Sequence, residues 1–140
     1  MILDKLVKKF VLDNFGSVSI FEHGKFGQTI FHLHVHYLPF KGRASDIVTE
    51  GGDKIFSIKS NENLQKFLQK DGGYLYLSIG NEKWIVTPSL TSPRFFRDRF
   101  AKVLHRSERG DWKKMRTNEL LMKIVHNENL TTQKLWLNRN

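Results

Sequence analysis

Residues 29–38 read Thr-Ile-Phe-His-Leu-His-Val-His-Tyr-Leu, and the rest of the chain is interpreted outward from this stretch. Histidine alternates with aliphatic or aromatic residues at a period of two, which is the pattern of a β-strand. Three of the six histidines of the chain therefore share one strand face, at intervals of about 6.5–7 Å. We expect that face to carry chemistry and the other to enter the core: the first holds His32, His34 and His36, the second Phe31, Leu33, Val35 and Tyr37.

Two kinds of site use histidines in this arrangement. Two imidazoles on one strand face can share a zinc ion, but zinc sites usually add a thiolate or a carboxylate. The chain has no cysteine, and the nearest acids are Glu22 and Asp46. In the other kind, a neutral imidazole attacks phosphorus while a cationic neighbour donates a proton to the leaving oxygen. A pKa near 6.5 allows neighbouring histidines to differ in protonation at neutral pH, so the pattern favours nucleophilic catalysis.

The segments before the histidines predict a helix and a hairpin. Apolar residues recur at helical spacing over residues 2–14, and Asn14-Phe15-Gly16 supplies a stop. Residues 17–22 alternate as a strand, and the glycine-bounded connection 23–27 joins them to the histidine strand. The sequence therefore predicts a hairpin over residues 17–38.

The segments after the histidines predict a β-α-β-β unit. Residues 54–59 have strand composition, and the following helix is capped by Ser60 or Asn61 and ends at Gly72-Gly73. Residues 74–79 and 83–87 flank Gly80-Asn81 as a second hairpin.

Two further helices complete the predicted order. Ser92 as a cap and Pro93 at the first helical position predict a helix over residues 93–106, with Phe95, Phe96 and Phe100 in the core. Thr117 is expected to cap a last helix that runs through Val125, and a polar tail follows it, whose Leu135, Trp136 and Leu137 should pack on the rest of the chain. We expect one α+β domain over residues 1–140, with a mostly antiparallel sheet flanked by helices, and a C-terminal extension over residues 54–126.

The composition of the chain limits the cellular compartment and the kinds of partner that we expect for this domain. No apolar run is long enough to span a membrane, and the first residues alternate charged and aliphatic side chains unlike a signal peptide. The lack of cysteine fits a reducing, cytoplasmic setting. The formal net charge of +9 suggests an anionic partner, with a merely solvated positive surface as the alternative.

Basic residues are concentrated in one segment. Residues 93–116 hold nine lysines and arginines against three acids. Such a density would suit phosphate contacts with nucleic acid, through Arg94, Arg97 and Arg106 among others, although a solvated helix face has the same composition.

With its flanks, the stretch Gly27-Gln28-Thr29-Ile-Phe-His32-Leu-His34-Val-His36-Tyr-Leu-Pro39 closely resembles the signature of the histidine triad (HIT) superfamily. That signature is histidine followed by an apolar residue three times, preceded by Gly-Gln-Ser/Thr. Phe21-Glu-His-Gly24 and the segment from Arg97 to Trp112 are similar to HIT-like proteins as well.

The resemblance implies a role for each residue of the motif. His34 would be the nucleophile that takes a nucleotidyl group, His32 would orient it, and His36 would assist the leaving group. Gln28 and Thr29 would contact phosphate. The implied protein is a nucleotidyl hydrolase or transferase that acts on a phosphoanhydride, phosphoramidate or ester, needs neither metal nor cofactor, and forms a homodimer.

The chain departs from the family pattern at its N-terminal end. A complete HIT domain has strands for the base and ribose before the triad hairpin and often a further histidine, whereas only residues 1–28 precede Thr29 here. His23 could stand in for that histidine, but a histidine in a hairpin loop is more often simply exposed. A piece of a longer chain, a shortened protein completed by a partner, and an inactive relative all stay open. The alternative function is accordingly a non-catalytic module that binds nucleotide or nucleic acid through its basic surface.

Overall fold

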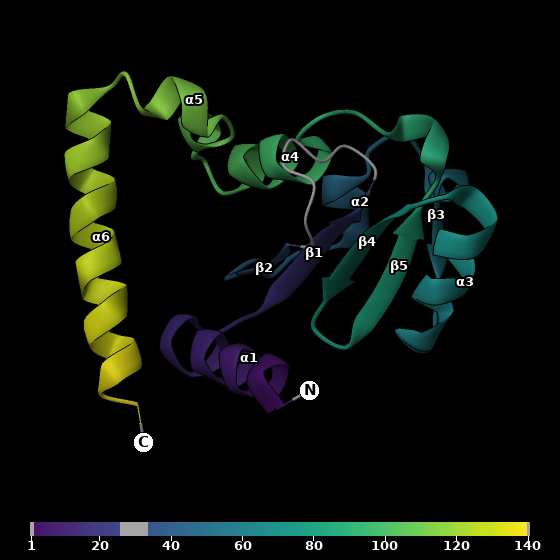
Figure 1. Ribbon diagram of the computed structural model, residues 1–140, viewed down its shortest axis with the longest axis horizontal. Helices are drawn as coiled ribbons and strands as arrows, with labels where there is room; N and C mark the ends of the chain where they lie inside the picture. Colours follow the sequence, from purple (N-terminus) through teal and green to yellow (C-terminus); the bar gives the residue numbers. More distant parts are fainter. Residues whose placement is uncertain (1, 26–33, 140) are drawn as a thin grey trace.

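A computed structural model describes residues 2–25 and 34–139, and it contains a five-stranded sheet with helices on both faces (Figure 1). The strand order is β2-β1-β4-β5-β3, and every neighbouring pair is antiparallel. The strands are β1 (Ser19–Gly24), β2 (Val35–Leu38), β3 (Ile55–Ser57), β4 (Tyr74–Ile79) and β5 (Glu82–Val86). The predicted α+β class with an antiparallel sheet is therefore confirmed.

The structure has more helices than the sequence predicts, because α2 and α5 are additional, and the last helix is longer than predicted whereas α4 is shorter. They are α1 (Ile2–Phe15), α2 (Ala44–Ile47), α3 (Glu62–Asp71), α4 (Phe95–Val103), α5 (Trp112–Met115) and α6 (Glu119–Leu137), with short 3-10 turns at Gly52–Lys54, Pro88–Leu90 and Ser107–Arg109. No helix in the described part of the chain is long and apolar enough to cross a membrane.

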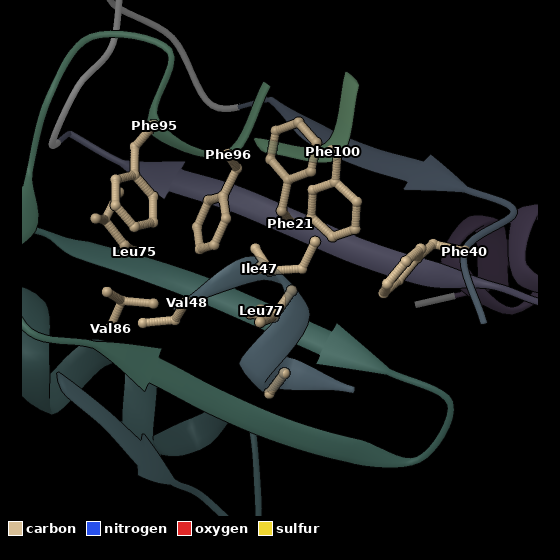
Figure 2. Packing of buried hydrophobic residues seen from close by; sticks show 11 residues of the cluster. Phe21, Phe40, Ile47, Val48, Leu75, Leu77, Val86, Phe95, Phe96 and Phe100 are labelled. Atoms are coloured by element: carbon tan, nitrogen blue, oxygen red, sulfur yellow. The ribbon is translucent and has the colours of Figure 1, made fainter. Parts of the chain in front are cut away.

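One face of the sheet carries the main core. Phe21 of β1 and Leu75 and Leu77 of β4 point to this face, which α2 and α4 cover (Figure 2). Phe96 and Phe100 of α4 lie directly over the sheet and are almost fully buried. The predicted core role of the phenylalanines in this helix is confirmed, because their helical spacing aims them at one face.

The opposite face carries a second, smaller cluster. Ile20, Tyr74, Tyr76 and Ile85 alternate with the residues of the first face, and Leu64, Phe67 and Leu68 of α3 pack on them. The helix α3 follows Asn61 and ends at Gly72, whose φ of +76° is the left-handed conformation that glycine adopts at low cost. The sequence prediction for this helix, including both of its ends, is confirmed.

The helix α4 begins two residues later than predicted. Arg94 has a left-handed backbone with a φ of +60°, so Pro93 lies outside the helix. Two carboxylates hold Arg94 there: its Nη1 donates to Asp111 at 2.8 Å and its Nε to Asp98 at 3.4 Å. These two ion pairs, one of them with the distant Asp111, override the proline signal.

The C-terminal end of α4 also differs from the prediction, because the helix stops at Val103 and not at Arg106. The N–H of Arg106 donates to the carbonyl of Ala101 at 2.7 Å, and that of His105 donates to Lys102 at 3.0 Å. Together with the φ of +56° at His105, these two bonds form a Schellman motif. Histidine stands here where glycine is usual.

The last helix is the largest correction to the sequence prediction. It starts at Glu119 and continues to Leu137, so the expected polar tail is helical. Its cap is Asn118, which accepts the N–H of Leu121 at 3.0 Å, and not Thr117. Residues 119–137 contain neither glycine nor proline, so nothing stops the helix at Val125. Of the three residues expected to pack on the chain, Trp136 does so, edge-on to Phe10 of α1 with ring centroids 5.0 Å apart. Leu135 and Leu137 are exposed, so the prediction is wrong for them.

Candidate histidine site

Two of the three predicted histidines lie in the described part of the chain. His36 belongs to β2 and His34 immediately precedes it. Their rings are nearly parallel, with centroids 6.1 Å apart, as expected for side chains two residues apart on one strand face. His32, Gln28 and Thr29 lie outside the described residues.

The histidine face of β2 is the core face of the sheet, which corrects the expected division of the strand. His36 is directly opposite Phe21 of β1, and the two rings stack with centroids 4.3 Å apart. Val35, expected in the core, is 42% exposed. Tyr37 does pack on the smaller cluster, and its hydroxyl donates to Asp4 of α1 at 2.7 Å.

The two histidines differ in their surroundings. His34 is exposed at the end of β2, whereas His36 is half-buried between the sheet and solvent. Burial is the main cause that lowers the pKa of His36 to about 4, and the charge of Arg97 and the neighbouring His34 and His23 lower it further. At neutral pH, His36 is therefore an uncharged imidazole with one N–H to donate and one lone pair to accept.

His23 is a member of this cluster that the sequence prediction placed in a loop. It lies in β1, two residues from Phe21 and on the same face. Its Nε2 accepts the N–H of Phe96 at 3.4 Å, and its ring lies edge-on to the Phe96 ring with centroids 5.5 Å apart. The alternation of Ser19, Phe21 and His23 was the signal that could have placed it in the strand.

Each residue of the segment Phe21–Gly24 is explained by its structural contacts. Besides the core roles of Phe21 and His23, Glu22 is 6% exposed and accepts the Tyr74 hydroxyl at 2.6 Å. Burial raises the pKa of this carboxyl group, and the hydrogen bond from Tyr74 opposes that rise. A Cβ on Gly24 would lie 2.4 Å from atoms of the Tyr74 ring, so a side chain cannot fit there without movement.

The three predicted arginines have different surroundings. Arg94 is bound by Asp98 and Asp111 and stabilises the start of α4, a structural role. Arg106 is exposed and lies where its charge acts on Glu128 of α6. Arg97 is half-buried, and of these three arginines it is the one whose charge lowers the pKa of His36. The structure thus brings Arg97, and neither of the others, to the candidate site.

The basic segment is partly neutralised inside the protein. Arg99 binds both oxygens of Glu50 and the carbonyl of Ile47, and Arg109 binds Glu128. Five other cations of residues 93–116 are exposed and form no ion pair with the described residues; they are Lys102, Arg106, Lys113, Lys114 and Arg116.

Within residues 2–25 and 34–139, no group of three or more histidine, cysteine, aspartate or glutamate side chains is arranged to hold a metal ion. His32, the first histidine of the motif, lies outside this range.

Comparisons of the chain with family models, with curated proteins and with solved structures give no match.

Proposed function

We propose that this chain has a HIT-like fold and is a nucleotidyl hydrolase or transferase of the histidine triad type. The observation that carries the proposal is the pairing of an exposed His34 with a half-buried, uncharged His36 on one strand face, beside Arg97. An exposed imidazole can reach a substrate phosphorus, and the second imidazole lies close enough to contact the same phosphate. The antiparallel sheet, with His36 on its edge strand β2, supports the assignment.

In the first step, a nitrogen of His34 forms a bond with the phosphorus of a nucleoside phosphoanhydride, phosphoramidate or ester. The bond from phosphorus to the leaving group breaks, and the leaving group departs with the electron pair. The product is a His34–nucleotide phosphoramidate. In the second step, the oxygen of water or another acceptor forms a bond to phosphorus and loses its proton to solvent, the P–N bond breaks, and its electron pair returns to the nitrogen of His34, which is regenerated.

His36 acts as an uncharged hydrogen-bond donor in this scheme. With a pKa of about 4 it carries almost no second proton at neutral pH before substrate binds. Its N–H can donate to the leaving oxygen, and an arriving phosphate anion raises its proton affinity as charge develops. This differs from a resident cationic acid, which the motif alone suggests.

The remaining motif residues complete the proposal through the family resemblance. His32 orients His34, and Gln28 and Thr29 contact phosphate oxygens. The homodimer that the resemblance implies stays a prediction, as does the identity of the nucleotide.

The test is to trap the covalent intermediate. The protein is incubated with a dinucleoside polyphosphate or nucleoside phosphoramidate that carries a label on the phosphorus next to the nucleoside, and is then denatured at alkaline pH. We expect acid-labile label on the wild type and none on His34→Ala. His126→Ala is the matched control, because His126 is an exposed histidine of α6. Absence of label on the wild type, together with unchanged substrate cleavage in His34→Ala, would overturn the proposal.

A second candidate function is binding of nucleic acid without turnover. It is favoured by the five exposed cations that lack an ion pair with the described residues and by Trp112, which is 37% exposed and lies under the guanidinium of Arg116. Binding through such a surface weakens steeply with salt. If salt-dependent binding of a single-stranded oligonucleotide survives in His34→Ala and no label forms on the wild type, this function replaces the first.

A further inference from the structure

The helix α4 lies against the sheet at its histidine end. Phe96 contacts His23 edge-on and also packs against Phe21, with ring centroids 5.4 Å apart. Phe21 in turn stacks on His36. These contacts fix the first turn of α4 next to the histidines, and Arg97 is the residue that follows Phe96.

Arg97 differs from the arginines on either side of it. Arg94 and Arg99 each bind a carboxylate, and Arg99 also lies over the Phe95 ring at 4.0 Å from its centroid. Within residues 2–25 and 34–139, Arg97 makes no ion pair, although it is half-buried. A partly desolvated guanidinium without a counter-ion costs free energy, and an anion bound beside it would recover that cost.

The charge of Arg97 also acts on the histidines directly. After burial, it is the largest influence that lowers the pKa of His36. The positive charge that disfavours protonation of His36 favours an anion at the same position.

We propose that Arg97 is the cation that binds the phosphoryl oxygens of the substrate at the His34–His36 site, and not a nucleic-acid contact of the basic segment. This inference rests on the proposed function for the identity of the anion. A guanidinium presents paired N–H donors that match two phosphoryl oxygens, and it keeps its charge at any pH in which the protein is folded. Because His36 is uncharged at neutral pH, Arg97 supplies the permanent positive charge among the described residues of this cluster.

The proposal also assigns a ligand class. The site should prefer anions with at least two free oxygens on one phosphorus, such as inorganic phosphate and nucleoside monophosphates, over carboxylates of similar charge. Bidentate geometry, more than net charge, sets this preference.

The experiment uses inorganic phosphate as the probe and the full chain as the protein. The imidazole signals of His34 and His36 are followed by NMR during phosphate titration at fixed pH and ionic strength. For Arg97→Gln we expect the Kd for phosphate to rise about tenfold, which corresponds to about 1.4 kcal/mol. Arg97→Lys should recover part of the affinity, and Lys102→Gln, an exposed cation of the same helix, should leave it unchanged.

A second measurement separates binding from damage to the fold. In Arg97→Gln without phosphate, the pKa of His36 should rise, while the near-UV circular dichroism stays that of the wild type. If the His36 pKa rises but the Kd for phosphate is unchanged, Arg97 lies near the site without binding the anion, and the inference is wrong.

The failure of this inference is distinguishable from failure of the proposed function. His34→Ala should keep phosphate binding, since Arg97 is intact, while losing covalent label. Phosphate binding that depends on Arg97, with no label on the wild type, removes the catalytic function and keeps the anion site. Label on the wild type, together with an unchanged Kd for phosphate in Arg97→Gln, keeps the catalytic function and removes the anion site.

Discussion

The imidazole of His36 lies parallel to the ring of Phe21, with an interplanar angle of 16° and centroids 4.3 Å apart. This stack places a candidate catalytic side chain against a residue of the main core, and it contributes to the burial that lowers the His36 pKa to about 4. Protonation of His36 is therefore coupled to folding.

The first prediction concerns stability against pH. Because the pKa of His36 is about 4 in the folded state and 6.5 when unperturbed, the unfolded chain takes up a proton that the folded chain does not. The unfolding free energy should fall as the pH drops from 6.5 to 4, by about 3 kcal/mol from this residue. Urea unfolding at several pH values measures it.

His36→Gln removes this contribution, so its unfolding free energy should depend less on pH in that window. His126→Gln is the control with an exposed histidine. Glu22, whose pKa is raised, acts in the opposite direction, because its folded form takes up a proton first as the pH falls. It is present in every variant, so the difference between wild type and His36→Gln isolates His36. Equal slopes for the two proteins would contradict the coupling.

The second prediction concerns Gly24. A methyl group at this position would overlap the Tyr74 ring, so Gly24→Ala should lower the unfolding free energy by about 1–3 kcal/mol. Gly52→Ala is the matched control, since an added Cβ there meets no atom within 4 Å. Urea denaturation of both variants would reject the packing argument if they changed stability equally.

The third prediction concerns the end of α4. His105 has a left-handed backbone, so His105→Gly should raise the unfolding free energy by about 0.5–1 kcal/mol. Lys102→Gly, inside the same helix, should lower it by about 1 kcal/mol. Thermal unfolding distinguishes the two, and a loss of stability in His105→Gly would show that the imidazole makes a contact worth more than the backbone strain.

The fourth prediction separates structural from surface arginines. Arg94→Gln breaks the contacts with Asp98 and Asp111 and should cost about 1 kcal/mol of stability. Arg106→Gln, at an exposed side chain, should change stability by less than about 0.5 kcal/mol. If the basic surface binds single-stranded nucleic acid, Arg106→Gln should lower the salt slope of binding by about 0.7, whereas Arg94→Gln should leave it unchanged.

Local signals in the sequence predict the elements that local interactions determine. The glycine at residue 72 ends α3 in a left-handed conformation, and the period-two pattern places His34 and His36 on one face. Which face of β2 is buried could not be predicted, because both faces carry large side chains. That choice is made by α4, which lies about sixty residues further along the chain.

The candidate site likewise combines features that local sequence predicts with features that depend on distant contacts. Its histidines are visible as a motif, but His23 and Arg97 join them only through contacts between β1 and α4. Arg94 and Arg97 are indistinguishable in sequence, since both are arginines near the start of a basic helix. Two acidic side chains, Asp98 and Asp111, make the difference by binding one and not the other.

The four residues Phe21–Gly24 serve opposite sides of the sheet in turn. Phe21 and His23 support α4 and the histidines, while Glu22 and Gly24 adapt to Tyr74 on the other side. Random mutagenesis of this strand should therefore yield few tolerated single changes and should recover function mainly by paired replacements, one in the strand and one in the layer that it faces. Substitutions in β1 should therefore be selected together with substitutions in α4 on one face and at Tyr74 on the other.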